Sequence, residues 1–494
     1  MRRVAHATVP GRTDHVVVVG AGLSGLSTAL HLLGAGRAVT VLEREPHPGG
    51  RTGRLDVDGF RIDTGPTVMT MPELVDDALA AVGSSLAERL ELTKLDPAYH
   101  ARFADGSTLD VHTDPEAMET EIRRLAGPQE ALGYRRLRAW LTELYQAEFD
   151  RFVASNFDSP LDLLHPSLAK VAALGAFGRL DNAIGRFVRD ERVRRVFSFQ
   201  ALYAGLPPQQ ALAAYAVIPY MDTIRGVYAV RGGLRQLPQA LADAATEAGA
   251  KFRYDTTVAG LERAGSRVTA VRTAAGERIP CDAVVLTTDL PVSYRLLGRA
   301  PRRPVGLRWS PSAVVLHLAS DRRAENFPHH TISFGAAWRG TFREIIRDGR
   351  LMSDPSLLVT TPTGVDPALA PAGRHLHYVL APCPNLQAGP LDWARLTPAY
   401  VDELRDVLAA RGLPAADGEL LHVTTPLDWA AQGHAAGTPF SAAHTFAQTG
   451  PFRPRNLVRG TENAVLAGSG TTPGVGIPTT LVSGRLAAAR ITGR

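Results

Sequence analysis

The stretch HVVVVGAGLSG, residues 15–25, decides the fold. Its β-branched start is typical of a buried parallel strand, and leucines at helical spacing follow the glycines. In a strand, turn and helix of this kind the three glycines permit a tight turn, a close approach of a pyrophosphate and helix–strand packing, while the helix N-terminus binds the anion. The stretch therefore predicts a Rossmann-like dinucleotide-binding domain. Its candidate binding residues are Gly20, Ala21, Gly22, Ser24 and Gly25.

A second apolar strand, residues 38–42, ends in Glu43. This acid lies 18 residues beyond Gly25, close to the spacing at which a carboxylate accepts hydrogen bonds from the adenosine ribose. Glycine-rich turns occur in any α/β protein, so the glycines alone are weak evidence. The strand before them, the helix after them and the terminal acid together favour a nucleotide site.

The segment after Glu43 indicates which dinucleotide is bound. It reads REPHPGGRT over residues 44–52 and FRIDTGPT over residues 60–67. This pattern resembles the extended fingerprint of the flavin monooxygenase and amine oxidase superfamily, in which a Gly-Gly-Arg segment runs beside the pyrophosphate and the flavin. The resemblance implies FAD as the cofactor, and a plain surface turn is the alternative. The segment adds the candidates Arg44, Gly50, Arg51, Gly65 and Thr67.

A later segment is expected to add strands to the cofactor domain. Residues 251–258, 267–272 and 282–286 read as strands joined by short turns, which suits a small antiparallel meander. The resemblance implies that the backbone at Val258 faces the adenine.

The closing segment, residues 464–491, reads as a strand, a glycine-rich loop at 468–478 and a helix. The positive end of that helix would stabilise the negative charge of a reduced flavin. Many flavoproteins have an Asp in this loop to hold the ribityl chain, whereas this sequence has Ser469 before a glycine. The candidates in the loop are Gly470, Gly476 and Ile477.

Since the cofactor segments are far apart, the expected fold is α/β, with a discontinuous Rossmann-like FAD-binding domain of the amine oxidase or flavin monooxygenase type. The segments between them form a second, α+β substrate domain, which carries a helical and possibly membrane-associating part. The expected division is FAD-binding 14–95, 228–289 and 450–494, and substrate-binding 96–227 and 290–449.

Composition sets limits on other functions. Of 494 residues 45% are hydrophobic and 21% charged, as in ordinary globular proteins. Cys281 and Cys383 lie 102 residues apart without C-x-x-C spacing, so we expect no disulfide, zinc site or other metal. A net charge of +5 does not by itself indicate nucleic acid, and we expect none as a partner. Residues 1–13 are predicted to be a loose cytoplasmic leader, and no stretch is long and apolar enough to span a membrane.

Residues 130–230 are apolar, helical and basic. The clusters Arg135–Arg138 and Arg192–Arg195 mix cations with large apolar groups, as helices lying on membranes do. The alternative is an ordinary amphipathic helix with salt bridges. The adjacent pair His329 and His330 is expected on the surface.

Four further motifs resemble the bacterial-type phytoene desaturases, and the match runs from about residue 14 to 490. They are FSFQALYAGLPP (197–208), YAVRGG (228–233), QTGPFRPRN (448–456) and GSGTTPGVGIP (468–478). Two positions depart from the family pattern: Thr287-Thr288-Asp289 replaces Asn-Ala-Asp, and Thr472 replaces His.

The resemblance implies removal of two hydrogens from a saturated C–C bond of a linear C40 carotene, phytoene or a partly desaturated product, with hydride passing to flavin N5. The flavin would be the only redox group, because no second dinucleotide motif and no catalytic triad are visible. The protein would mainly align an apolar chain in a dry tunnel. Candidate lining residues are Phe197, Phe199, Tyr203 and Tyr215.

Three alternatives stay open: a carotenoid isomerase or retinol-saturase-like enzyme, an amine oxidase, and a carrier that only binds carotenoid. The expected partners are an apolar polyene and an external electron acceptor, either oxygen or a quinone. A water-insoluble substrate also predicts peripheral association with the cytoplasmic face of a membrane.

Overall fold

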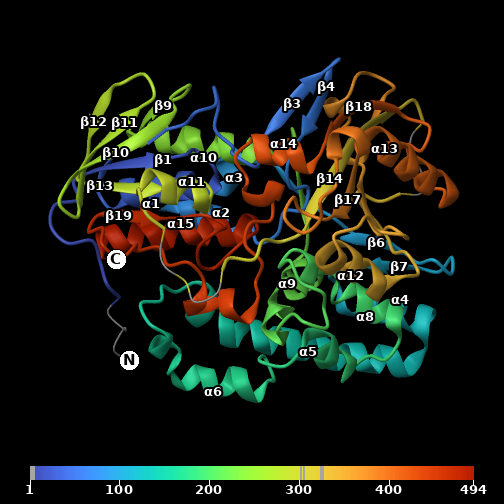
Figure 1. The fold of residues 1–494 in the computed structure, drawn as a ribbon. Coiled ribbons are helices and arrows are strands. Elements are labelled where there is room, and N and C mark those ends of the chain that lie inside the picture. The colour runs from blue at the N-terminus through green and yellow to red at the C-terminus, as the bar shows by residue number, and fades with distance from the viewer. Residues whose placement is uncertain (1–5, 301–302, 304–305, 323–326, 494) are drawn as a thin grey trace.

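Two large β-sheets, three smaller ones and a helical part are seen in the described residues (Figure 1). The computed structural model describes residues 6–300, 303, 306–322 and 327–493. A parallel sheet lies on the left of Figure 1, a larger and mostly antiparallel sheet lies on the right, and helices fill the space below. This arrangement confirms the predicted α/β class with a second, α+β part.

The parallel sheet draws its five strands from distant segments. Alternate valines of its central strand face opposite sides: Val16 and Val18 pack against helices, whereas Val17 and Val19 pack against an antiparallel meander. Burial on both faces is what an uninterrupted valine run predicts. The strand order is β19 (Ala464–Leu466), β13 (Ala283–Leu286), β1 (His15–Val19), β2 (Ala38–Leu42) and β9 (Lys251–Arg253).

The two faces of this sheet carry different layers. On one face, leucines of the helices form an apolar core with the sheet. On the opposite face, an isoleucine and valines of the meander form a second apolar core with the sheet. The helices are α1 (Leu23–Gly34), α2 (Glu73–Ala80), α10 (Gln236–Glu247) and α15 (Ile477–Thr492). The meander consists of β10 (Val258–Ala264), β11 (Arg267–Thr273) and β12 (Arg278–Pro280).

The predicted meander was wrong in part. Residues 251–253 form β9, which pairs in parallel with β2, and β13 likewise joins the parallel sheet beside β1. The chain leaves the sheet after Arg253, and Asp255 adopts a φ of 52°, which ends the strand before Val258 begins β10. Only the strands between β9 and β13 form the meander.

The second sheet has seven strands. Its strands pair antiparallel except β15 and β6, which run parallel. Helix α13 (Trp393–Ala410) covers one face through Trp393, Tyr400 and Leu404. The order is β18 (Glu419–Thr424), β14 (Ser312–Ser320), β17 (His375–Cys383), β16 (Leu357–Thr360), β15 (His330–Ser333), β6 (Tyr99–Arg102) and β7 (Thr108–Val111).

A helical part packs against the end of the second sheet and shares one apolar core with β6, β7 and β15. Its helices are α4 (Pro115–Ala126), α5 (Pro128–Glu148), α6 (Pro166–Ala173), α7 (Leu180–Gly185), α8 (Glu191–Val196) and α9 (Val217–Tyr220). The remaining elements are β3 (Arg54–Val57), β4 (Phe60–Asp63), β5 (Leu92–Lys94), β8 (Tyr228–Val230), α3 (Leu86–Arg89), α11 (Leu290–Leu296), α12 (Trp338–Arg343) and α14 (Pro426–Ala431).

The arginine clusters of the helical part are ion-paired. Arg135 pairs with Glu119, Arg192 with Asp190 at 2.7 Å, and Arg194 with Asp181 at 2.7 Å. Arg195 is buried and donates to the carbonyl of Gly335 at 2.8 Å. These contacts favour the salt-bridged alternative for Arg135 and for the cluster Arg192–Arg195, whose cations have protein partners, whereas Arg138 donates, among the described residues, only to the Tyr134 hydroxyl at 3.2 Å.

The expectation of a surface pair at His329 and His330 is wrong for His330, and His329 is half-buried. His330 is completely buried in β15 and its Nδ1 lies 2.9 Å from Thr360 Oγ1. Burial lowers the pKa of His329 to about 4, so both rings are neutral at pH 7.

The predicted loose leader is also wrong for its described part, residues 6–13; residues 1–5 lie outside the described residues. Val9 is buried and its N–H donates to the carbonyl of Arg490 at 2.7 Å. The guanidinium of Arg490 donates in turn to the carbonyl of Ala7 at 2.7 Å. This cation, almost fully buried, holds the segment because it needs those acceptors.

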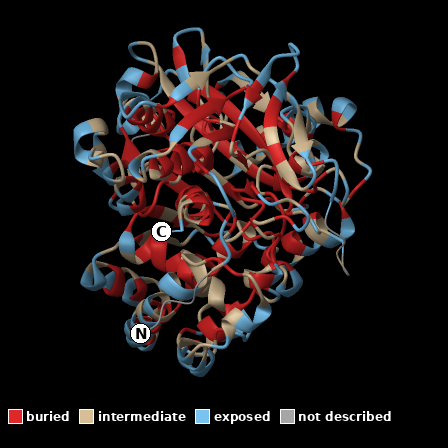
Figure 2. Cartoon of the chain, turned by 90° about the vertical axis from the view of Figure 1, so that its left-hand side faces the viewer, coloured by how far each residue is buried: buried red, intermediate tan, exposed pale blue. Residues whose placement is uncertain are grey.

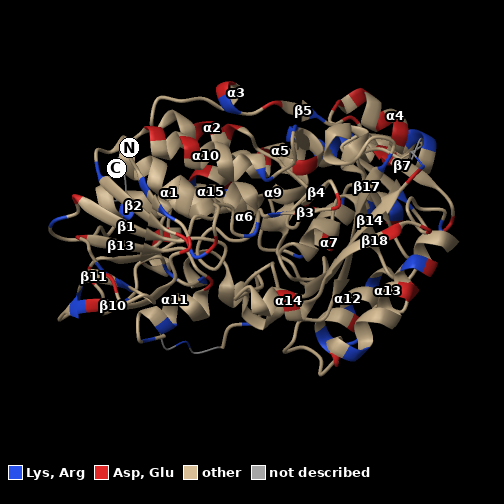
Figure 3. Ribbon diagram, turned by 90° about the horizontal axis from the view of Figure 1, so that it is seen from above, with Lys and Arg blue, Asp and Glu red and all other residues tan. Residues whose placement is uncertain are grey.

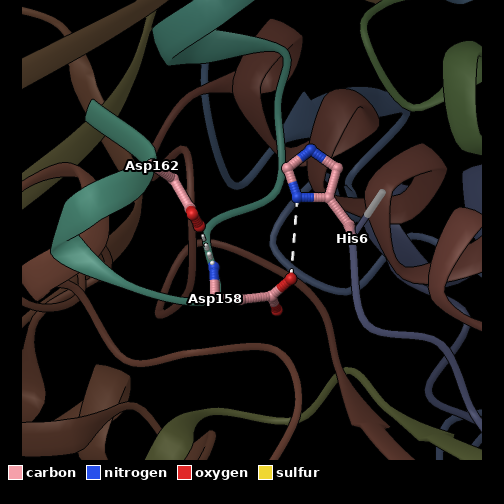
Figure 4. A group of neighbouring side chains, drawn as sticks. All are labelled: His6, Asp158 and Asp162. Carbon is pink, nitrogen blue, oxygen red and sulfur yellow. Dashed lines mark hydrogen bonds and ion pairs between the residues drawn. The ribbon is translucent and has the colours of Figure 1, made fainter. Parts of the chain in front are cut away.

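His6, Asp158 and Asp162 form a group, within the described part of the chain, whose atoms lie close enough for a metal ion (Figure 4). Asp162 Oδ2 instead accepts from the N–H of Asp158 at 2.6 Å and caps the short helix 160–163. Asp158 Oδ2 lies 3.6 Å from His6 Nδ1, and Asp158 Oδ1 pairs with Arg490 Nη1 at 2.7 Å. A cap and an ion pair therefore explain these carboxylates.

Burial and charge follow the layers. The buried ribbon lies in the interior and the exposed ribbon on outer helices and loops (Figure 2). Residues of both signs are interspersed around the rim of the view from above (Figure 3). Across the described residues, no helix combines the length and hydropathy that crossing a bilayer requires.

Candidate functional site

A cavity of about 1350 Å³ runs between the parallel sheet, the second sheet and the helical part. The ends of β1 and β2, the segment after Glu43 and the loop before α15 all reach its wall. Most predicted cofactor residues line it, so distant segments do converge on one space. These are Gly20, Gly22, Ser24, Glu43, Arg44, Gly50, Arg51, Gly65, Thr67, Val258, Gly476 and Ile477.

Two glycines at the turn after β1, Gly20 and Gly25, have no room for a side chain. A Cβ on Gly25 would lie 2.0 Å from the carbonyl oxygen of Gly20, and Gly20 itself has a φ of 105°. A Cβ on Gly20 would lie 2.4 Å from Thr287 Oγ1. Both positions thus require glycine. Backbone atoms block a side chain at Gly25, and the positive φ disfavours other residues at Gly20.

Two helix N-termini face the cavity without caps. Helix α1 begins after Gly22 and α15 begins after Gly476, and neither N-cap makes a side-chain hydrogen bond. Neither first turn contains an acid. Their free N–H groups and dipoles therefore suit anionic groups, the pyrophosphate at α1 and the pyrimidine edge of a reduced flavin at α15.

Glu43 is buried at the end of β2. Its Oε2 accepts from the N–H of Ala21 at 2.7 Å and its Oε1 from the N–H of Glu45 at 3.0 Å. Each carboxylate oxygen retains a further lone pair that can accept a ribose hydroxyl. The two backbone bonds fix the carboxylate beside the glycine turn.

Arg51 has unused hydrogen-bonding capacity. It donates to Ser469 Oγ at 2.7 Å and to Asp289 Oδ2 at 3.3 Å, whereas its buried Nε has no partner among the described residues. Burial lowers the pKa of Arg51, and Asp289 opposes that shift. An orphaned buried donor beside two bare helix N-termini fits a phosphate-bearing cofactor such as FAD.

Three predicted residues do not line the cavity. Ala21 is buried and its N–H holds Glu43, and Gly25 packs against the backbone of Gly20. Gly470 faces the side chain of Leu290, 2.5 Å from where its Cβ would be. Its neighbour Ser469 reaches the wall instead and holds Arg51. The polar side chains at this point are thus Ser469 and Asp289, which the sequence pattern did not single out as ligands.

The rest of the cavity is mainly apolar. Tyr203 and Tyr215 line it as predicted, but Phe197 and Phe199 do not. Phe197 is fully buried in the helical core and stacks near Tyr134 with centroids 5.8 Å apart. Apolar lining residues come from helices and from the second sheet: Val171, Val217, Ile218, Met221, Val315, Leu358 and Leu380.

Titratable groups also line the cavity, and sequence reasoning missed them. Glu148 is buried without a partner for its Oε1, and burial raises its pKa well above the usual value. Asp222 accepts from Tyr99 at 3.1 Å, and burial raises its pKa to about 7. A signal existed for Glu148, because it continues the buried stripe of Leu137, Leu141 and Leu144 at helical spacing.

Neither cysteine has a role in this site. Cys281 and Cys383 are buried free thiols, and burial raises the pKa of Cys281 to about 12. Neither lines the cavity. They are unreactive thiols at neutral pH because the thiolate is disfavoured.

The comparisons agree with this geometry. The family described as flavin containing amine oxidoreductase matches residues 23–492. A phytoene dehydrogenase of Streptomyces griseus is 67% identical over 490 residues, which cover 98% of this chain and 96% of that protein. A zeta-carotene-forming phytoene desaturase of Myxococcus xanthus is 35% identical, with 98% and 95% covered.

Solved structures share the fold. An oxidoreductase from Methanosarcina mazei superposes with a TM-score of 0.66 at 16% identity, covering 95% of this chain and 99% of that one. Putrescine oxidase bound to putrescine gives 0.61 at 17% identity, covering 98% and 100%. At these identities the likeness concerns the fold alone. The family match and the near relatives together show that the chain is an FAD-dependent oxidoreductase that belongs to the flavin-containing amine oxidoreductase family.

Proposed function

We propose that the chain desaturates a linear C40 carotene, phytoene or a partly desaturated product, in carotenoid biosynthesis. The observation that carries the proposal is a largely apolar cavity of about 1350 Å³ that continues from the cofactor segments into the second sheet and the helical part. A relative 67% identical over nearly the whole chain bears the name phytoene dehydrogenase. An elongated hydrocarbon needs alignment rather than polar recognition, and this wall offers that.

The predicted cofactor residues would hold FAD in this proposal. The turn at Gly20 and Gly22 and the N-terminus of α1 would bind the pyrophosphate, and Glu43 the adenosine ribose. Arg51 would donate its free Nε to the cofactor. When bound, the flavin supplies hydride acceptance at N5. The division of the chain into three FAD-binding segments and two substrate-binding segments stays a prediction, and these FAD-binding roles rely on it.

Expression in cells that accumulate phytoene tests the proposal. Coloured carotenes should appear with the wild-type chain and not with Gly25→Ala, whose Cβ would overlap the Gly20 carbonyl. Gly340→Ala is the matched control, because its Cβ would meet only Ala337 Cβ at 3.6 Å. If the wild-type flavoprotein leaves phytoene unchanged, and also leaves partly desaturated carotenes unchanged in cells that accumulate them, the proposed substrate is refuted.

The competing activity is amine oxidation, since the family name includes amines. The cavity wall is apolar on its substrate side, and burial raises the pKa of Glu148 well above its usual value, so this acid favours the neutral form and is a poor partner for an ammonium group. Flavin bleaching by amines in air-free solution, with none by phytoene, would favour the amine oxidase.

Substrate delivery requires a membrane surface, and the exposed apolar side chains suggest where it lies. Phe177, Phe446 and Phe452 are exposed and also line the cavity, so they mark its mouth. Leu161 and Leu164 are exposed on the segment beside the turn at 450–452. We propose that this mouth, rather than the paired arginine clusters, rests on the cytoplasmic face of a membrane.

Liposome sedimentation tests the mouth. Leu161→Glu with Leu164→Glu should lower binding at least ten-fold, since burying two leucines contributes about 3–6 kcal/mol. Leu132→Glu is the control, because Leu132 is also an exposed leucine but lies on α5 and not on the segment beside the turn at 450–452. Equal sedimentation of the double variant and wild type would contradict this placement.

The proposed electron acceptor is external, either oxygen or a membrane quinone. Reduced enzyme mixed with each acceptor in separate anaerobic and aerobic reactions should regain oxidised flavin with at least one of them. Failure with both would contradict this part of the proposal.

A further inference from the structure

One wall of the cavity carries a hydrogen-bonded chain of three side chains. Tyr215 lies in the short helix 213–216, and its hydroxyl is 2.9 Å from His444 Nδ1 and 2.6 Å from Thr449 Oγ1. The rings of Tyr215 and His444 meet edge to face, with centroids 5.2 Å apart. All three residues line the cavity.

The tautomer of His444 depends on the direction of these bonds. Thr449 Oγ1 has one hydrogen and two carbonyls within reach, those of Thr445 at 2.8 Å and of His444 at 3.1 Å. When that hydrogen goes to a carbonyl, Thr449 accepts from Tyr215, and the Tyr215 oxygen then accepts from His444 Nδ1, which leaves a lone pair at Nε2. When Thr449 donates to Tyr215 instead, the ring hydrogen lies on Nε2.

His444 is buried, and its Nε2 has no partner among the described residues. A buried polar atom without a partner lowers stability. The ring lies against the flavin loop: a Cβ on Gly474 would come 2.5 Å from Nε2, two residues before the N-cap of α15. Other buried histidines, such as His377, also leave one ring nitrogen unpartnered, but among the described residues His444 is the one of this kind that lines the cavity.

We propose that His444 Nε2 accepts the proton that leaves the carotene when the new double bond forms. The inference rests on the proposed function and adds a catalytic residue to it. Tyr215 is a positioning residue, since it acts by holding the Nδ1–H tautomer.

The atoms and electrons balance. One C–H bond of the substrate gives its hydrogen and both electrons to the flavin, and the adjacent carbon gives its hydrogen to Nε2 as a proton while its C–H electron pair becomes the π bond. The external acceptor reoxidises the flavin, and the imidazolium returns its proton to solvent.

The surroundings keep the base available. Burial, and then Arg453, lower the pKa of His444 well below its usual value, so the imidazole is neutral at neutral pH. The other ionisable groups near these three side chains are Tyr215 itself and Glu148. A charge on Glu148 would raise the pKa of Tyr215. A weak base is sufficient, because a carbon that has lost hydride releases the adjacent proton readily.

The kinetic test uses His444→Gln, which fills similar space and has no basic atom. Loss of a general base lowers kcat about 10²–10⁴-fold, whereas flavin content and carotene binding should stay unchanged. Phytoene deuterated at the proton-losing carbon should show a larger isotope effect on the variant than on wild type. His377→Gln is the control: His377 is also buried with one nitrogen on a hydroxyl and the other unpartnered, but it does not line the cavity.

A second test does not need activity. Nitrogen-15 NMR of the purified flavoprotein should find His444 protonated on Nδ1, and Tyr215→Phe should change that tautomer population. An Nε2–H tautomer in wild type would overturn the inference, as would wild-type turnover by His444→Gln. If the wild-type protein does not convert phytoene, the proposed function fails. That result differs from the two above, which would overturn only the role given to His444.

Discussion

Adding one methyl group at Gly25 should abolish cofactor retention. The new Cβ would lie 2.0 Å from the Gly20 carbonyl oxygen and 3.2 Å from its carbon. Reaching even a 3.0 Å contact requires the turn and α1 to separate by about 1 Å. Both atoms that resist are backbone, so no rotamer change can relieve the overlap.

The magnitude follows from the bonds that this shift breaks. Hydrogen bonds from N–H groups to a charged phosphate contribute about 1.5–3 kcal/mol each. Misplacing two of them in the turn therefore weakens FAD binding by about 3–6 kcal/mol, or about 10²–10⁴-fold in Kd.

Titration of FAD into the flavin-free protein measures this effect, with circular dichroism as a check on folding. Gly340→Ala in α12 should bind FAD like wild type, since its Cβ makes only an ordinary contact. A folded Gly25→Ala protein with wild-type affinity would refute the role given to the turn.

Three further predictions concern charged groups. Glu43→Gln should weaken FAD binding about 5- to 150-fold in the same titration, because the amide leaves the N–H of Ala21 or Glu45 without an acceptor. Arg51→Met should lower the free energy of unfolding of the flavin-free protein by about 3–5 kcal/mol, since it leaves the buried Asp289 carboxylate unpaired; urea titration would show no change if that pair were dispensable. Burial raises the pKa of Asp222 from 3.8 to about 7, so its stabilising contribution is complete below pH 3.8 and is lost as pH rises to 7. The Tm advantage of Asp222→Asn over wild type should therefore grow across that window and level off above pH 7, and a constant difference would contradict the shift.

The cofactor half was predictable because its physics is local. A valine run, three glycines and a terminal acid each imply one structural element, and β1, β2 and α1 lie where these patterns indicate. The closing loop and α15 were predictable for the same reason. The residues of this half that did not behave as predicted are those whose role depends on a distant partner, such as Gly470 against Leu290.

The substrate half was less predictable because its contacts join segments far apart in sequence. Phe197 and Tyr203 stand in one apolar motif, yet only Tyr203 reaches the cavity. His444 lies in a loop without periodicity, and its partner Tyr215 is 229 residues away. The arginine clusters looked amphipathic, but their acidic partners Glu119 and Asp181 come from other helices. Likewise, neither residues 6–13 nor the sequence around Arg490 contains a pattern that predicts the contact between them.

The most direct test of the central claim is an anaerobic single turnover of the purified flavoprotein with phytoene, in which flavin absorption and carotene products are both measured. The account predicts bleaching of the bound flavin with one new double bond for each flavin reduced. New double bonds without bleaching, or product formed by protein that contains no flavin, would contradict it.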